Sequence, residues 1–186
     1  MRVITGTARG RRLETLSGED VRPTADRVKE AIFSILQFDI EGRHFLDLFA
    51  GSGQMGIEAL SRGAAGAVFV DAADPSVQIV RKNLQACGFA DRAQVFRADY
   101  ASYLARTKER FDIAFLDPPY RAGLLPDALE KTAACMQPHG VILCEHPMER
   151  KGEAPLLPEE AGGFIKQRVY RYGKIAVSLY RKKADA

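Results

Sequence analysis

The stretch that most constrains the fold of this chain is FLDLFAGSGQMGIEALSRG, which runs from Phe45 to Gly63. It begins with an apolar run that carries one carboxylate, Asp47, and such a run is typical of a buried strand. Gly51-Ser52-Gly53 then allows a sharp turn and a close approach of the backbone to a ligand. An amphipathic helix follows and ends at Gly63. This order predicts an α/β fold with a site for a nucleotide-like cofactor at the helix N-terminus.

Two cofactors fit this glycine turn. Gly51, Gly53 and Gly56 match the dinucleotide fingerprint G-x-G-x-x-G. Asp71 ends the next apolar run at the spacing of a ribose-binding acid. However, Asp47, Gly51 and Gly53 also match the D-x-x-x-G-x-G loop found in S-adenosylmethionine-dependent methyltransferases, where Asp71 would again bind the ribose. The turn alone therefore leaves both cofactors open.

A second motif, Asp117-Pro118-Pro119-Tyr120, separates these two interpretations. It follows the apolar run from Phe111 to Leu116, at the strand end where open α/β sheets bind ligands. The two prolines stiffen the segment and remove two hydrogen-bond donors. Such an acceptor cluster suits a planar base with an exocyclic amine, whose hydrogens the Asp117 carboxylate and the Pro118 carbonyl would accept, while Tyr120 stacks on the base. The nitrogen lone pair then points at an electrophilic methyl group, and catalysis is mostly positioning and electrostatics.

With both motifs, the chain resembles the RsmD-type 16S ribosomal RNA (guanine-N2)-methyltransferases, which are small class I enzymes, over nearly its whole length. The most family-specific part is the block from Arg22 to Val28, RPTADRV, and the glycine loop is the least specific. Further matches are Gly10-Arg11, Phe33, LDLFAGSG, Gly56-Ile57-Glu58-Ala59 and Asn83-Leu84. One departure follows the ribose carboxylate: members often place a second acid two residues later, where this chain has Ala73 and then Asp74.

The resemblance implies a Rossmann-like, seven-stranded sheet with an antiparallel last strand, preceded by an N-terminal β-hairpin and helix extension. It implies methyl transfer from S-adenosylmethionine to the exocyclic N2 amine of one guanine in 16S rRNA, in the small ribosomal subunit or an assembly intermediate. It also suggests that Asp99, after the third predicted strand, accepts from the adenine amino group. The predicted residues form three sets. The catalytic set is Asp117, Pro118, Pro119 and Tyr120; the cofactor set is Asp47, Gly51, Ser52, Gly53, Asp71 and Asp99; the RNA set is Arg9, Arg11, Arg12, Arg22, Thr24 and Arg27.

Charge is distributed unevenly along the 186 residues. Residues 1–29 hold seven basic and four acidic side chains, a sum of +3, and residues 164–186 hold seven basic and one acidic, a sum of +6. Because the whole chain sums to +3, the middle sums to −6. This pattern is expected when a cationic cofactor binds inside and a polyanion outside, although a basic tail is also ordinary surface charge. The length suits one domain, with residues 1–40 as an RNA-contacting extension and 41–186 as the core.

Hydrophobic periodicity predicts the remaining elements. A β-hairpin is expected over Met1–Leu16, with a basic tip at residues 6–10. Predicted strands cover 67–70, 93–97, 111–116 and 141–145; predicted helices start at the N-caps Thr24 and Asp74 and also cover 100–106 and 124–136. Residues 164–181 read as two strands turning at Gly173, unlike the βαβ repeats of a dehydrogenase. Tyr170 and Lys174 have the Y-x-x-x-K spacing of some dehydrogenases, but that motif needs a helix to align its residues.

The cysteines and histidines indicate no metal site. Three cysteines lack metal-ligand spacing and are expected as free thiols in a reducing cytoplasm, and the three histidines are scattered. No apolar run reaches the length of a membrane span, and the first residues lack the apolar core of a signal peptide. We therefore expect a monomeric, cytoplasmic protein without membrane contacts.

Three alternatives remain beside rRNA methylation. A DNA adenine or tRNA methyltransferase would use the same D-P-P-Y chemistry, but such DNA enzymes usually carry an added target-recognition domain, for which this chain has no room. An NAD-binding oxidoreductase would use the glycine loop alone. A ribosome-assembly binding protein would use neither motif for chemistry. The intact D-P-P-Y motif argues against such a protein, whose catalytic site would have decayed.

Overall fold

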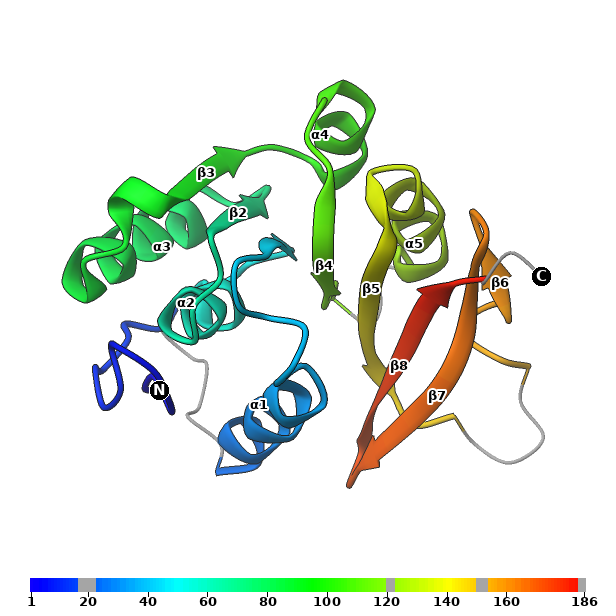
Figure 1. The fold of residues 1–186 in the computed structure, drawn as a ribbon, viewed down its shortest axis with the longest axis horizontal. Helices are drawn as coiled ribbons and strands as arrows, with labels where there is room; N and C mark the ends of the chain where they lie inside the picture. The colour runs from blue at the N-terminus through cyan, green and yellow to red at the C-terminus, as the bar shows by residue number, and fades with distance from the viewer. Residues whose placement is uncertain (17–22, 120–122, 150–153, 184–186) are drawn as a thin grey trace. The chain divides into compact units, whose positions relative to one another are not determined.

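The computed structural model describes residues 1–16, 23–119, 123–149 and 154–183, without the side chains of residues 23–25. The structure divides into two units, Met1–Asp99 and Tyr100–Ala186 (Figure 1). Within the described ranges, no helix has the length and apolar character that crossing a membrane requires.

The first unit is built on three parallel strands. Its elements are α1 (Pro23–Ile35), β1 (His44–Leu48), α2 (Gln54–Ser61), β2 (Gly66–Asp71), α3 (Asp74–Cys87), the short 3-10 helix η1 (Ala90–Arg92) and β3 (Ala93–Arg97). Strand β2 pairs in parallel with β1 on one side and β3 on the other. The helices α2 and α3 pack against these strands (Figure 1). The residues of β1 and β2 are buried almost throughout, as expected for strands covered on both faces.

The N-terminal segment, residues 1–16, makes a single β-bridge, Arg2 to Arg12, instead of the predicted two-stranded hairpin. Its two arms are nevertheless joined by ladder hydrogen bonds: the Val3 and Leu13 amides donate to the Arg11 and Met1 carbonyls at 2.9 and 3.0 Å. The buried carboxylate of Glu58 on α2 accepts the amides of Ile4 (2.8 Å) and of the next residue, Thr5 (3.0 Å). These bonds to α2 take the place of a longer strand ladder.

The second unit ends in antiparallel strands, as predicted. Its elements are α4 (Tyr100–Arg106), β4 (Phe111–Leu116), α5 (Leu125–Ala133), β5 (Met136–Pro147), β6 (Glu160–Ala161), β7 (Phe164–Tyr172) and β8 (Ile175–Lys182). Strand β5 pairs in parallel with β4 and antiparallel with β8, which in turn pairs antiparallel with β7. The turn is at Gly173, with φ 61°, and no helix joins Tyr170 to Lys174, so the dehydrogenase-like spacing of these two residues is coincidental.

The main corrections concern element ends. Helix α3 begins at Asp74 with Ala73 as its N-cap, so Asp74 is not the cap; its carboxylate lies 3.3 Å from Arg97 Nη1 instead. Thr24 is not an N-cap either, because α1 already begins at Pro23. Helix α5 is shorter than predicted and β5 longer, and the two-residue β6 brings the described strands to eight where seven were expected. The predicted helix end at Gly63 is confirmed, with φ 101°, and α3 ends in the same way at Gly88, with φ 74°.

Candidate active site

The glycine loop turns the chain sharply between β1 and α2. The amides of Phe49 and Ala50 both donate to the Val70 carbonyl at 3.0 Å, and the Gly53 amide donates to the Ala50 carbonyl at 2.7 Å. The loop needs positive φ at Gly51 (54°) and Gly53 (76°), and also at Phe49 (69°), which lacks a glycine's freedom. A bulky residue held in this region is strained and is typical of functional sites.

The three glycines of the loop have different roles. A Cβ at Gly51 would meet no atom within 4 Å, so the loop is open at that point. A Cβ at Gly53 would come within 3.1 Å of the Val80 side chain, and one at Gly56 would lie 2.3 Å from the Phe69 ring. Gly56 is therefore required by helix–strand packing, whereas Gly51 leaves space for a ligand to approach the backbone.

Asp71, at the end of β2, holds the loop in place. One of its carboxylate oxygens accepts the Gly51 amide at 2.9 Å, and the other accepts the Ala73 amide at 2.8 Å. Each carboxylate oxygen can accept a second hydrogen bond. Asp71 is half-buried and fixed in orientation, so it can both shape the glycine loop and receive hydroxyl groups of a ribose.

Asp47, in β1, is buried beneath the loop, with 2% exposure. Its Oδ2 accepts the amide of Gly56 in the first turn of α2 at 2.9 Å. The pKa of the Asp47 carboxyl is raised to about 7, chiefly by burial; the Gly56 hydrogen bond opposes this rise, and the neighbouring charge of Asp71 adds to it. A cation bound near Asp47 would favour its ionised form.

Ser52 and Asn83 join the loop to the N-terminal segment. Asn83 Nδ2 donates to the Ser52 carbonyl at 2.9 Å and to the Glu14 carbonyl at 3.0 Å, and its Oδ1 accepts the Glu14 amide at 2.8 Å. The Ser52 hydroxyl donates to the Met1 sulfur at 3.7 Å. Asn83, which the sequence analysis noted only as a family match, thus positions residues 1–16 beside the glycine loop.

The acids predicted for the cofactor lie along one edge of the first unit. Asp47 lies near the end of β1, Asp71 ends β2, and Asp99 is exposed two residues beyond β3. Because the Ala98 amide donates to the Asp71 carbonyl at 3.0 Å, the backbone before Asp99 is held against the end of β2. The structure thus brings the cofactor set to the carboxyl ends of parallel strands, where open α/β sheets bind ligands.

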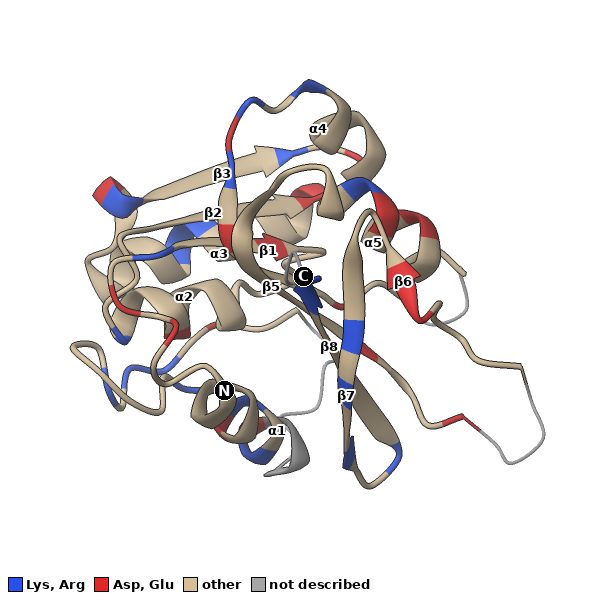
Figure 2. Ribbon diagram, turned by 45° about the vertical axis from the view of Figure 1, so that its right-hand side comes forward, with Lys and Arg blue, Asp and Glu red and all other residues tan. Residues whose placement is uncertain are grey.

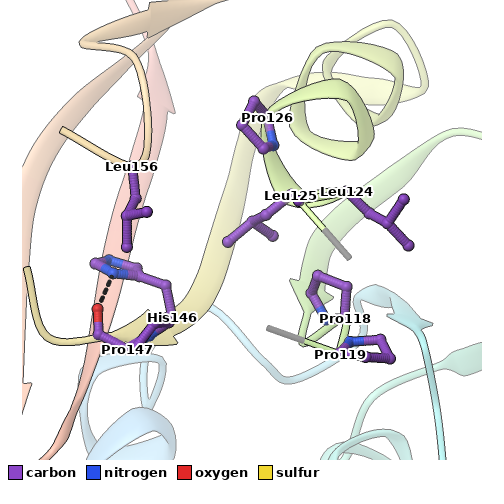
Figure 3. A pocket seen from close by; sticks show the side chains of 9 residues that line it. Pro118, Pro119, Leu124, Leu125, Pro126, His146, Pro147 and Leu156 are labelled. Carbon is purple, nitrogen blue, oxygen red and sulfur yellow. Dashed lines mark hydrogen bonds between the residues drawn. The ribbon is translucent and has the colours of Figure 1, made fainter. Parts of the chain in front are cut away.

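In the second unit, the motif predicted to be catalytic directly follows β4. Asp117 is half-buried, Pro118 is buried and Pro119 is exposed, whereas Tyr120 lies outside the described residues. The two prolines line a largely apolar cavity of about 120 Å³ together with Leu125 and Leu156 (Figure 3). The corner therefore borders an apolar surface that a flat base could contact.

His146, near the end of β5, forms another wall of this cavity (Figure 3). Its Nδ1 lies 2.9 Å from the Pro147 carbonyl, which can only accept, so Nδ1 carries the hydrogen. Its Nε2 lies 2.9 Å from the Ser178 hydroxyl, within hydrogen-bond distance. With both nitrogens engaged and 3% exposure, His146 is fixed in place as a wall of the cavity. Sequence reasoning missed it because its partner lies 32 residues away.

The predicted RNA residues are only partly described. Arg9, Arg11 and Arg12 are exposed on the N-terminal segment, and Arg27 is exposed on α1. Figure 2 shows basic positions in blue on both segments. Arg22 lies outside the described residues, as does the side chain of Thr24.

Comparison with known proteins identifies the family. The family model described as conserved hypothetical protein 95 matches residues 1–181. The chain is 39% identical to the putative rRNA methyltransferase YlbH of Bacillus subtilis, over 98% of this chain and 100% of the relative. It is 36% identical to the ribosomal RNA small subunit methyltransferase D of Escherichia coli K12, over 100% of this chain and 91% of the relative. The chain belongs to the RsmD family.

A solved structure supports the same assignment. The putative methyltransferase yhhF from Escherichia coli has a TM-score of 0.85 and 35% identity to this RsmD-family chain, and the match covers 100% of this chain and 99% of that one. The predicted α/β methyltransferase fold is thereby confirmed. The RsmD family membership also makes this chain a methyltransferase.

Proposed function

We propose that this chain transfers a methyl group from S-adenosylmethionine to the exocyclic N2 amine of a guanine in small-subunit ribosomal RNA. The observation that carries the proposal is the corner after β4, where the half-buried Asp117 directly precedes Pro118 and Pro119, two residues that line an apolar cavity. The printed names of the B. subtilis and E. coli relatives, both rRNA methyltransferases, support RNA as the substrate class.

The residues of the first unit suit the cofactor. Asp71 would receive the ribose hydroxyls through the free lone pairs of its fixed carboxylate, and Asp99 would accept from the adenine amino group. The open backbone at Gly51 leaves room for the ligand, and the buried Asp47 would be ionised by a nearby positive charge. When bound, S-adenosylmethionine supplies the electrophilic methyl group on a sulfonium.

The corner at Asp117 would prepare the amine. The lone pair of a guanine N2 amine is delocalised into the ring, which makes it a poor nucleophile. If Asp117 and the Pro118 carbonyl accepted its two hydrogens, the nitrogen could pyramidalise and direct its lone pair at the electrophilic methyl group that the cofactor would supply. The surplus proton then leaves the methylated amine for Asp117 or solvent, so no base of shifted pKa is needed.

The substrate base must leave its stack to reach this corner. Flipping costs a few kcal/mol and is easiest in loops, where unstacked bases are common. Tyr120 would stack on the flipped base, and the exposed arginines of the N-terminal segment and Arg27 would contact phosphates, which position RNA without reading its sequence. We propose a guanine in 16S rRNA, presented by the small subunit or an assembly intermediate.

Two measurements test the proposal. Isothermal titration with S-adenosylhomocysteine and with NAD should show binding of the former only, and binding of NAD alone would overturn the choice of cofactor. Mass spectrometry of rRNA nucleosides from a deletion strain should show the loss of one N2-methylguanosine from the small-subunit rRNA. Loss of a methylated adenine or of a tRNA modification would assign another substrate.

A further inference from the structure

Two arginines of the N-terminal segment face each other at its β-bridge. Arg2 and Arg12 are the paired residues, and together with Met1 and Asp26 they line an open crevice of about 390 Å³. Like charges placed directly opposite each other on paired strands are destabilising. An arrangement that keeps two guanidinium groups together therefore suggests an anionic ligand.

Asp26, on α1, compensates only part of this charge. Its Oδ2 lies 4.0 Å from Arg2 Nε, which is too long for a hydrogen bond, and the Arg2 side chain is 69% exposed. The other oxygen of Asp26 is buried and has no hydrogen-bond partner in the described part of the chain. Two guanidinium groups facing one carboxylate leave an excess of positive charge at the crevice.

The backbone under the two arginines is fixed. The ammonium of Lys29, a residue with 1% exposure, donates to the Arg2 carbonyl at 2.7 Å, and the Leu13 amide beside Arg12 donates to the Met1 carbonyl at 3.0 Å. The guanidinium groups themselves remain exposed at the crevice. The crevice is thus preorganised in its backbone, which lowers the entropic cost of binding.

Arg11 does not share this crevice. Successive side chains of an extended segment point to opposite sides, and Arg11 lies near Cys87 at the end of α3, where its charge lowers the pKa of a thiol that burial raises. The neighbouring arginines therefore serve different surfaces. The crevice also adjoins the glycine loop, because Met1 both lines the crevice and accepts from the Ser52 hydroxyl.

We infer that the Arg2–Arg12 crevice binds one phosphodiester group of the RNA substrate. Each guanidinium offers a planar fork of N–H donors that matches two oxygens of a phosphate. A phosphate held here would fix the RNA backbone beside the cofactor loop. The inference rests on the proposed function, since that function makes RNA the polyanion in question.

The test is the salt dependence of binding of purified 16S rRNA in a filter assay, with the full-length chain. Arg2→Ala and Arg12→Ala should each weaken binding about threefold to tenfold and reduce the slope of log K against log salt by about 0.7–0.9, the value for one phosphate contact. Because both arginines hold the same phosphate, the double variant should lose no more slope than either single variant. Arg81→Ala, which removes an exposed arginine from α3, is the matched control and should leave the slope unchanged.

Several outcomes would overturn the inference. Slopes of the Arg2 and Arg12 variants equal to that of Arg81→Ala would refute the site, and a double variant that loses twice the slope would mean two separate phosphates. If inorganic phosphate at matched ionic strength competes with RNA, and the variants keep the wild-type slope of RNA binding against salt, the ligand of the crevice is a free anion and not the RNA. S-adenosylhomocysteine titration and a methylation assay distinguish failure of this inference from failure of the proposed function. A wild-type chain that neither binds S-adenosylhomocysteine nor methylates rRNA would refute the proposed function. If the chains are active but the salt slopes of the Arg2 and Arg12 variants equal the wild-type slope, only the phosphate site is refuted.

Discussion

The buried carboxyl of Asp47 predicts how stability depends on pH. Its pKa rises from 3.8 to about 7 in the folded chain, chiefly through burial. As pH increases, the unfolded chain ionises Asp47 first, so the folded state becomes less stable from about pH 4 to pH 7 and changes no further above that. Because each pH unit changes the free energy of unfolding by ~1.4 kcal/mol, the ionisation of Asp47 lowers that free energy by about 4 kcal/mol in total. About 3 kcal/mol of this loss falls between about pH 5 and pH 8.5.

Asp47→Asn removes this ionisation and keeps an oxygen that can accept the Gly56 amide. Urea unfolding of both chains across that pH range should show the variant gaining about 3 kcal/mol relative to wild type as pH rises. Asp91→Asn, at an exposed position of η1, is the control, and its free energy of unfolding should change with pH as that of wild type does. If the free energy of unfolding of Asp47→Asn also followed that of wild type across this pH range, the reasoning about the buried carboxyl would be refuted.

Two further predictions concern the loop and the N-terminal segment. Gly56→Ala, which forces a Cβ to 2.3 Å from Phe69, should lose about 1–3 kcal/mol in urea unfolding, and an unchanged midpoint would contradict its packing role. Gly51→Ala has open space at its Cβ, so only the strain of an alanine at φ 54° should lower its stability, by about 1–2 kcal/mol. Gly51→Ala should also weaken S-adenosylhomocysteine binding at least tenfold in calorimetry, and binding equal to wild type would contradict its role at the ligand. Glu58→Gln removes the buried carboxylate that lies 3.7 Å from the Lys29 ammonium and 2.8 Å from Arg62 Nε, and should cost about 3–5 kcal/mol. Adding Lys29→Met should reduce that loss, and an unchanged urea midpoint of Glu58→Gln would argue against the buried ion pair.

Elements whose signals are local were predictable from the sequence. The bounds of β4 at Phe111–Leu116 and of α4 at Tyr100–Arg106 follow from runs of apolar residues and their period, and the structure reproduces both. The acids at the strand ends could also be predicted, because a short stretch of sequence shows both the apolar strand and the acid that follows it. Asp71 was predicted for the ribose, but its bond to the Gly51 amide adds a structural role that spacing did not show.

The missed features depend on contacts between distant residues. Glu58 and Asn83 support the N-terminal segment through partners 54 and 69 residues away, which no local pattern encodes. Asp74 was predicted as an N-cap, but α3 begins at Asp74 itself, one residue earlier than that prediction requires. The Asp74 carboxylate pairs instead with Arg97, 23 residues later.

The most direct test of the proposed chemistry is single-turnover methyl transfer to 16S rRNA by wild type and Asp117→Ala, with S-adenosylhomocysteine affinity measured on the same preparations. If Asp117 orients the amine, the rate should fall by about 10²–10³-fold, as when a positioned polar group is removed from an active site, while the dissociation constant stays within about twofold. A variant that transfers the methyl group at the wild-type rate would contradict the account.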